Sequence, residues 1–361
     1  MDRVSSRRRN DEATMTRIVQ LLSHSIEAYD QLRLYTSMGI EAVDIGGYIN
    51  PAQPHDRKRP ALPEAPYFSE LQAAVDSLGT QDNLRAAQEH VPDAYLDWLG
   101  DDGVIIQHHY LERMVGQWPR LRDWMRGAPR RRIIWRTVGQ SVEHNERMMS
   151  SLRNDGLEIV RYSPKERNIP QYAGEDALIR FYKDPADYGG WTGEGEYVLG
   201  FGQDYVQRDP WTNYRFFKAA TEGLPTRIIG PGSEDYGGPG EVPFDDLRKE
   251  LRRARVFCYT GTQPASYTLG LVEAMMTGTP TVSIGPKWFD IFPYGPQMFE
   301  GHELVQHAYD DPSEARNVLQ HFLDRDAEHD RRQSDFMRLQ RTNAGLFDRN
   351  TIAAQWKAFL S

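Results

Sequence analysis

The stretch from Ala254 to Pro286 reads ARVFCYTGTQPASYTLGLVEAMMTGTPTVSIGP. Val256 to Thr260 is a short run of β-branched and aromatic residues, which indicates a buried strand. Apolar residues at helical spacing follow from Tyr267 to Thr277, and Gly278 stands where a helix-ending glycine belongs. Thr281 to Ile284 is a second apolar run. A strand, a helix and a strand in this span predict one βαβ unit of a parallel sheet.

One residue of the predicted helix does not suit a pure packing role. Glu273 stands between Val272 and Ala274, on a helix that is otherwise apolar. A carboxylate buried there without a partner would cost several kcal/mol. We therefore expect Glu273 to reach the protein surface, a Lys or Arg side chain, or the hydroxyl of a ligand.

The run EAMMTGTP, from Glu273 to Pro280, resembles the donor-binding segment of GT-B glycosyltransferases, in particular the retaining family four. The resemblance implies an α/β fold of two Rossmann-like parallel-sheet domains that face each other across a cleft. It also implies that Glu273 binds the ribose of a nucleotide sugar. In that family another glutamate precedes this one, and its position falls on Ala265, whose side chain accepts no hydrogen bond.

Composition sets limits on the function. The chain has 361 residues, enough for two domains, and a net charge of −9, which argues against a chain-wide nucleic-acid surface. Its single cysteine, Cys258, excludes a disulfide framework and indicates a reducing compartment. No apolar run approaches the roughly 20 residues of a membrane span, and no signal-peptide pattern is present. We expect a cytoplasmic protein.

The domain organisation follows from composition and from the resemblance. Residues 1–14 are polar and are expected to form a disordered tail. Residues 15–190 are expected to form the acceptor domain, and residues 191–345 the nucleotide-sugar donor domain. Residues 346–361 are expected to form a helix that crosses back to the first domain. The proline-rich run from Asn50 to Pro66 predicts a surface loop.

The first half carries the expected acceptor side. Ile18 to Leu22 predicts the first strand, and the resemblance places Ser23 and His24, just after it, at the cleft. No Gly-x-Gly-x-x-Gly follows, so a dinucleotide cofactor is not expected. Val104 to Gln107 predicts a strand that ends at His108 and His109. These histidines line the cleft by resemblance, and His109 is the candidate catalytic base by position alone. No third ligand at metal spacing is visible, so no metal is expected.

The turn after the predicted strand Arg131–Val138 also bears on the site. The resembling family often has a histidine there, and here the residue is Gly139. Leu157 to Tyr162 and Ala177 to Phe181 are expected to be the last two strands of this half.

The second half carries the expected donor side. Tyr197 to Phe201 predicts a strand that leads into Gly202. Family four enzymes have an arginine next and a lysine further on, and both hold the donor diphosphate. Here Gln203 replaces the arginine and Arg208 stands at the lysine position, so Arg208 is expected to face the leaving group. The full expected donor set is Gly202, Gln203, Arg208, Gly230, Ser266, Tyr267 and Glu273.

The resemblance implies a glycosyltransferase that moves a sugar from a UDP- or GDP-linked donor to an acceptor hydroxyl. It implies retained stereochemistry, no metal and no further cofactor. The acceptor stays open among a glycan, a lipid, a small metabolite, a protein and a modified DNA base, so nucleic acid enters only as an acceptor. One alternative is a degenerate GT-B module that binds a nucleotide sugar or glycan without transfer, motivated by Ala265 and Gln203. Another is a GT-B epimerase or phosphorylase.

Overall fold

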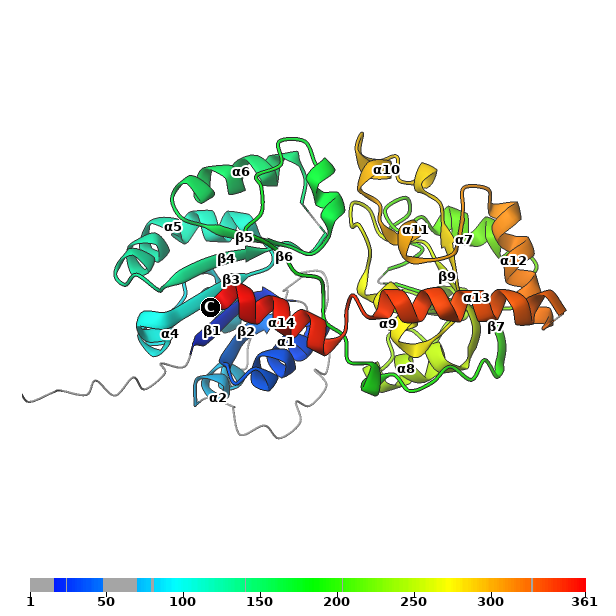
Figure 1. Cartoon of the computed structure of the whole chain (residues 1–361), viewed down its shortest axis with the longest axis horizontal. Coiled ribbons are helices and arrows are strands. Elements are labelled where there is room, and N and C mark those ends of the chain that lie inside the picture. The colour runs from blue at the N-terminus through cyan, green and yellow to red at the C-terminus, as the bar shows by residue number, and fades with distance from the viewer. Residues whose placement is uncertain are drawn as a thin grey trace, which may run out of the picture.

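Each half of the chain builds its own parallel β-sheet, flanked by helices (Figure 1). The structure is a computed structural model that describes residues 16–23, 25–47, 70–78, 81–139, 141–202, 204–325 and 327–361. The expected tail, the expected loop from Asn50 to Pro66, His24 and Gln203 lie outside these residues. The predicted α/β fold with two parallel-sheet domains is confirmed.

The first sheet has the strand order β2-β1-β3-β4-β5-β6. Its strands are β1 (Arg17–Ser23), β2 (Glu41–Gly47), β3 (Gly103–Gln107), β4 (Arg132–Arg136), β5 (Glu158–Arg161) and β6 (Ala177–Leu178). Val19 of β1 pairs with Val43 of β2 and with Ile105 of β3, and all three are fully buried. Helices cover both faces, which is why these strands are continuous apolar runs.

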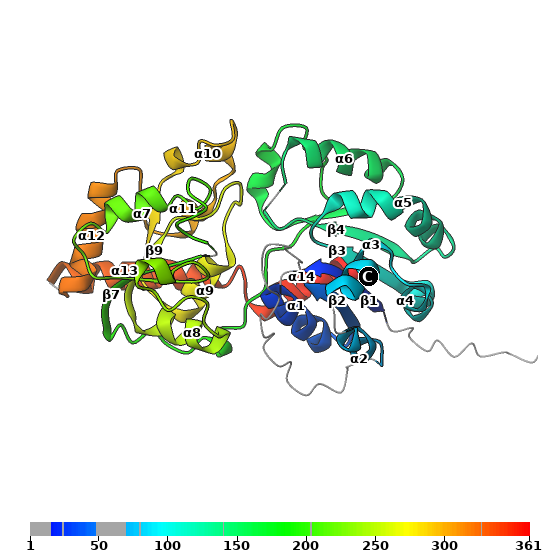
Figure 2. The same ribbon diagram turned by 180° about the vertical axis from the view of Figure 1, so that it is seen from behind.

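The helices of the first half are α1 (Ser25–Ser37), α2 (Glu70–Ser77), α3 (Gln81–Glu89), α4 (Asp93–Leu99), α5 (Leu111–Arg126) and α6 (Glu143–Asn154). Short 3₁₀ turns cover Gly100–Asp102, Pro164–Asn168 and Pro185–Asp187. Because α5 and α6 follow β3 and β4 directly, both helices start at the carboxyl edge of the sheet, next to the other half (Figure 2).

The second sheet has the order β11-β10-β9-β7-β8. Its strands are β7 (Gly195–Phe201), β8 (Thr226–Ile229), β9 (Ala254–Tyr259), β10 (Thr281–Ile284) and β11 (His307–Tyr309). Its helices are α7 (Tyr214–Ala220), α8 (Phe244–Arg253), α9 (Leu269–Thr277), α10 (Gly295–Met298), α11 (Gly301–Leu304), α12 (Pro312–Asp324) and α13 (Ala327–Ala344). Two 3₁₀ turns cover Glu234–Tyr236 and Pro286–Trp288.

The βαβ unit predicted from residues 254–286 is present as β9, α9 and β10. Helix α9 is buried from Gly270 to Thr277. Gly278 ends it with φ of 84°, and its amide donates to the carbonyls of Ala274 and Met275. A left-handed residue at this position suits glycine because it has no Cβ.

The last strand of the first half is shorter than the sequence predicts. We expected a strand from Ala177 to Phe181, but β6 ends at Leu178. Beyond it the chain turns toward the second half, where Arg180 pairs with Glu300 at 2.6 Å. The ring of Phe181 stacks on Tyr162 with 5.0 Å between ring centroids. These contacts remove the two residues from the sheet edge.

The final helix, α14 (Arg349–Leu360), lies against the first half, beside α1 (Figure 1). The side chain of Asp348 caps it by accepting from the amides of Asn350 and Thr351. Ile352 and Trp356 are fully buried in a cluster with residues of the first sheet. The second half therefore sends its last helix back into the core of the first.

Replacing Trp356 with alanine should destabilise the protein by about 3–5 kcal/mol, because a large buried ring would leave a cavity. The control is Lys357→Ala on the exposed face of α14, expected to change stability by about 0.5 kcal/mol or less. Urea unfolding followed by circular dichroism measures both. Equal stability of the two variants would show that α14 does not support the first half.

Candidate active site

A cavity of about 700 Å³ lies where the carboxyl ends of the two sheets face each other. Ligands of open α/β sheets bind at this edge because the loops after the strands converge there. The first half contributes Glu27, His109, Val138, Gly139 and Phe181 to its wall. The second half contributes residues that include Gly202, Arg208, Gly230, Tyr267 and Glu273. The structure thus brings five of the expected donor residues and His109 to one cavity.

Two glycines shape the part of the cavity wall that the second half forms. Gly202 follows β7 and Gly230 follows β8. Gly230 has φ of 128°, and a Cβ placed on it would lie 2.2 Å from the carbonyl oxygen of Gly202. No larger residue fits at Gly230 without moving the neighbouring strand end, so the backbone itself forms this part of the wall.

The start of α9 also lines the cavity, through Thr268, Leu269 and Gly270. Thr268 occupies the N-cap position, but its side chain makes no capping hydrogen bond. The amides of Leu269 and Gly270 thus keep their capacity to bind an anion, and the helix dipole favours negative charge at this end. Gly270 packs so closely on Phe201 that an added Cβ would lie 2.5 Å from that ring.

Arg208 lies on the turn between β7 and α7 and lines the same cavity. Its side chain is exposed. Its backbone is fixed, because its amide donates to the carbonyl of Asp204 and its carbonyl accepts from the amide of Trp211. An exposed guanidinium at the rim can approach a diphosphate with little change in the protein core.

Glu273 reaches a lysine of the other half. Its Oε1 accepts a hydrogen bond from Lys183 Nζ at 2.9 Å, and the same ammonium lies 2.7 Å from Asp30 Oδ2. All three residues are buried. Lys183 follows β6, Asp30 belongs to α1 and Glu273 to α9. The expectation that Glu273 needs a partner is confirmed, and that partner joins three segments of the chain.

This group of three carries one negative charge in excess. Burial alone would lower the pKa of the Lys183 ammonium, but Asp30 and Glu273 raise it well above its usual value. Burial raises the pKa of Asp30 to about 6 despite the attraction of Lys183. Lys183 is therefore charged at neutral pH, and its pairing offsets the cost of burying two carboxylates.

A second buried ion pair lies within the first half. Glu27 of α1 lies 3.0 Å from Nδ1 of His108 and 3.9 Å from Nε of Arg136. Burial alone would raise the pKa of Glu27, but the charges of His108 and Arg136 outweigh it and lower the pKa to about 2. The carboxylate therefore stays ionised and orients the His108 ring.

The turn that carries both histidines is held by Gln107, the last residue of β3. Its buried side-chain amide donates to the carbonyls of His109 and Tyr110, each at 2.9 Å. Tyr110 has φ of 56°, in the left-handed region, and precedes α5 directly. The turn is thus fixed with His108 against Glu27 and His109 in the cavity wall.

Two departures from the resembling family meet in space. A Cβ placed on Gly139 would lie 2.8 Å from the Cβ of Ala265 and 2.8 Å from the hydroxyl of Tyr162. The two small residues therefore face each other across the cleft. A histidine at position 139 and a glutamate at position 265 could not both occupy this space.

Ser266 and Tyr267 join the two halves. The amide of Ser266 donates to the hydroxyl of Tyr162 at 2.5 Å, and Tyr267 donates its hydroxyl to the Tyr162 carbonyl at 2.9 Å. Tyr267 lines the cavity, but Ser266 is fully buried and is not among the lining residues. The structure thus does not bring Ser266 to the cavity.

The remaining expected residues are less informative. Ser23 is the last residue of β1, and His24 lies outside the described residues. Among the residues that the structure describes, no group of three or more His, Cys, Asp or Glu side chains could hold a metal ion. Within the same residues, no helix is both long and apolar enough to cross a membrane.

Lys183, Glu27 and Gln107 are the site residues that sequence reasoning did not select. Lys183 alone had a signal, because a glutamate in an apolar helix requires a cation or a ligand. Glu27 and Gln107 act through contacts with residues that no local pattern identifies.

No protein-family profile matches this sequence, and no curated protein matches it. Solved structures do share its architecture. HepE from Anabaena, in complex with UDP and glucose, covers 96% of this chain and 99% of its own at 14% identity, with a TM-score of 0.61. Its complex with UDP-glucose covers 95% and 99% at 14% identity, with a TM-score of 0.60. A glycosyltransferase from Rickettsia africae covers 96% and 98% at 8% identity, with a TM-score of 0.62.

The chain has the GT-B glycosyltransferase fold. The expected GT-B architecture is therefore confirmed. At these identities the likeness concerns the fold alone, so the assignment to the retaining family four stays a prediction.

The low pKa of Glu27 gives a stability prediction. A folded pKa of about 2 lies below the value of about 4.3 in an unfolded chain, so the pair stabilises the protein above that pH and loses its contribution as the pH falls toward 2. From pH 7 to pH 3.5 the wild type should lose about 1 kcal/mol more than Glu27→Gln. Urea unfolding at both pH values measures this difference. The control is Glu196→Gln, an exposed residue that should keep the wild-type pH dependence. If the free energy of unfolding changes equally with pH in the wild type and in Glu27→Gln, the ion pair of Glu27 is contradicted.

Proposed function

We propose that this chain is a glycosyltransferase that moves a sugar from a UDP- or GDP-linked donor to an acceptor hydroxyl. One observation carries the proposal. A single cavity of about 700 Å³ between the two sheets combines the Gly202–Gly230 backbone wall, the uncapped start of α9, Arg208 and Glu273. These groups suit the parts of a nucleotide sugar in order, with the ribose at Glu273 and the diphosphate at α9.

The ribose end rests on the geometry of Glu273. Oε1 is occupied by Lys183, whereas Oε2 accepts no hydrogen bond from another described residue. A carboxylate oxygen in a cavity wall suits a sugar diol, whose hydroxyls donate hydrogen bonds. Lys183 would hold this carboxylate in place from behind. The binding of UDP and UDP-glucose by HepE, which shares the fold, supports a nucleotide sugar as ligand.

The diphosphate end rests on positive charge. The amides at the start of α9 and the guanidinium of Arg208 lie along the same cavity wall. Charge develops on the leaving diphosphate as the glycosidic bond breaks, and preorganised donors stabilise it. We propose Arg208 as the residue that carries most of this effect, and we propose that no metal is needed because these donors supply the charge.

We further propose that transfer retains the configuration of the sugar, on the strength of the likeness of residues 273–280 to family four. His109, which lines the acceptor side of the cavity, is proposed to contact the acceptor hydroxyl. Cytoplasmic location is proposed from the single, buried Cys258.

A second candidate is a module that binds a nucleotide sugar without transfer. The contact between Gly139 and Ala265 favours it, since the carboxylate that the resembling family places near the donor sugar is absent. Incubation with a panel of UDP- and GDP-sugars separates the two. Release of free nucleotide, undiminished by EDTA, supports a metal-independent transferase. Binding of a nucleotide sugar without any release supports the binding module, and loss of release in EDTA with rescue by Mn²⁺ overturns metal independence.

Glu273→Gln should weaken UDP binding by about 1.5–3 kcal/mol if the ribose donates to this carboxylate. The amide keeps an oxygen that accepts from Lys183, so the fold should persist. Titration calorimetry with UDP measures the effect. The exposed Glu234→Gln serves as the control and should bind UDP as the wild type does. Unchanged affinity in Glu273→Gln would remove the ribose role.

Arg208→Ala should lower kcat/KM by about 10²–10³, the scale for loss of one donor to a developing anion. Ground-state binding of UDP should fall less, because leaving-group charge grows toward the transition state. Arg208→Lys should recover part of the activity. The control is Arg215→Ala, which removes a nearby exposed arginine that pairs with Asp209 and is not part of the cavity wall. If Arg208→Ala instead destabilises the protein, and the molecules that remain folded keep full activity, Arg208 has a structural role.

A further inference from the structure

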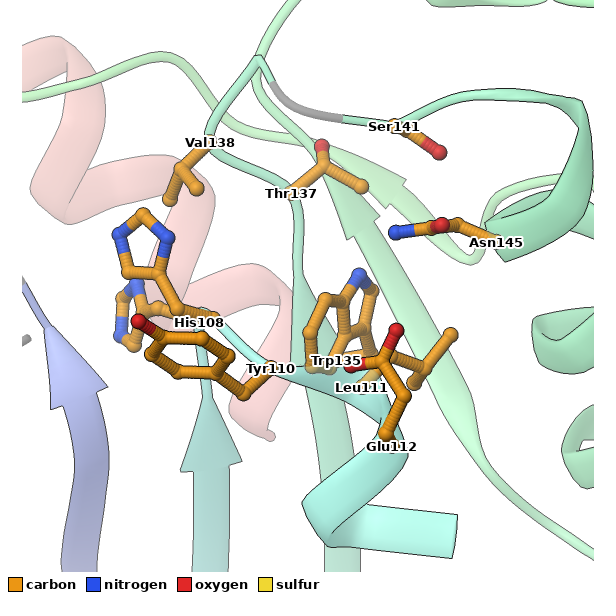
Figure 3. Close-up of a pocket in the computed structure, with 10 residues that line it drawn as sticks. His108, Tyr110, Leu111, Glu112, Trp135, Thr137, Val138, Ser141 and Asn145 are labelled. Carbon is orange, nitrogen blue, oxygen red and sulfur yellow. The ribbon is translucent and has the colours of Figure 1, made fainter. Parts of the chain in front are cut away.

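A second cavity, of about 170 Å³, lies within the first half, at the ends of β3 and β4 and the starts of α5 and α6 (Figure 3). It shares His109 and Val138 with the larger cavity, so the two meet at these residues. Its volume is below the range of drug-sized pockets and suits a single ring with its substituents.

Several polar groups around this cavity have capacity left for a ligand. Figure 3 shows the amide of Asn145 reaching from α6 toward Thr137 and Trp135, and Glu112 rising from the first turn of α5. Neither Asn145 nor Glu112 makes a side-chain hydrogen bond or ion pair with another described residue. His108 is fully buried, and its Nε2 makes no hydrogen bond to the described residues, although Nδ1 lies beside Glu27.

Other polar groups of the wall already donate hydrogen bonds within the protein. Thr137 donates its hydroxyl to Glu166 at 2.9 Å, and Ser141 donates to Glu146. These hydroxyls form a fixed wall that can still accept hydrogen bonds. The cavity therefore offers an amide donor at Asn145, acceptors at Glu112 and the two hydroxyls, and a ring nitrogen at His108, next to the apolar ring of Trp135.

The charged groups around the smaller cavity determine which charge a ligand can carry there. The starts of α5 and α6 would by themselves favour an anion. However, Glu112 stands in the first turn of α5, and Glu143 and Glu146 stand in that of α6. A phosphate in this cavity would face the carboxylate of Glu112 directly, which is repulsive. A neutral ring with several hydroxyls both donates and accepts hydrogen bonds, so it matches the wall.

We propose that the smaller cavity binds a neutral sugar unit of the acceptor and directs one of its hydroxyls toward His109. This inference rests on the proposed transferase function and adds the class of acceptor. It favours a glycan or a glycoside over a nucleic acid or a phospholipid, whose phosphates Glu112 would repel.

The test uses the full chain and a panel of neutral methyl glycosides, with inorganic phosphate as the anionic probe. Saturation-transfer NMR should detect binding of at least one glycoside at millimolar concentration and no binding of phosphate at this site. The same glycoside should accelerate UDP release from the sugar donor. Asn145→Ala and Glu112→Gln should each raise its half-saturating concentration at least tenfold, because the first removes a partner of a ligand hydroxyl and the second replaces a charged acceptor by a weaker, neutral one.

Two matched controls lie on α12, far from both cavities in the sequence. Asn317→Ala removes an exposed amide, and Glu314→Gln removes an exposed carboxylate from the first turn of a helix, as Glu112→Gln does. Both controls should leave glycoside binding unchanged, and thermal unfolding checks that all four variants fold.

The outcomes separate this inference from the proposed function. If UDP binds and the donor is cleaved but no glycoside of the panel binds, the acceptor class is wrong and the donor function stands. If phosphate binds and Glu112→Gln strengthens it, the cavity is an anion site and the inference is overturned. If UDP does not bind at all, the transferase proposal fails. NMR then still measures whether a glycoside binds to the smaller cavity.

Discussion

The two halves of this molecule depend on one buried ammonium group, that of Lys183. It lies 2.7 Å from the carboxylate of Asp30 and 2.9 Å from that of Glu273. Removing one partner of a buried ion pair leaves an uncompensated charge, which is strongly destabilising. Loss of Lys183 would leave both carboxylates without a cation, so both depend on it, and the three residues belong to α1, to the segment after β6 and to α9. The residue proposed to hold the donor is in this way fixed by the half proposed to hold the acceptor.

Sequence patterns predicted the second half better than the first for a physical reason. The bounds of β10 match the expected range, Thr281 to Ile284, because this strand has a clear local pattern. Helix α3 is short and mostly polar, and packing against β2 and α5 defines it rather than periodicity. The same holds at the site. Glu273 was predictable as a residue in need of a partner, whereas the partnership of Glu27 with His108 joins residues far apart in the chain.

The close approach of Gly139 and Ala265 changes how each of these two substitutions is interpreted. By itself, Ala265 suggests a lost sugar ligand. The structure shows that its neighbour across the cleft is small as well, and that Tyr162 fills the adjacent space with its hydroxyl on the amide of Ser266. The two halves thus approach closely at this point. Any donor sugar would have to be held by residues elsewhere along the cavity, and His109 and Val138 are the wall residues that it shares with the smaller cavity.

The contact between Glu27 and His108 orients a hydrogen-bonding group toward the smaller cavity. The pKa of Glu27, lowered to about 2, keeps that carboxylate ionised across the physiological range. A carboxylate beside Nδ1 holds a proton on that nitrogen, which leaves Nε2 as the ring nitrogen without a hydrogen bond to the described residues. His108 lines the smaller cavity, so the buried charge of Glu27 orients this nitrogen there. A ring nitrogen of this kind can hydrogen-bond to a hydroxyl group, which both donates and accepts. The orientation of His108 and the polar groups of the cavity wall therefore favour the same proposed ligand, a neutral sugar.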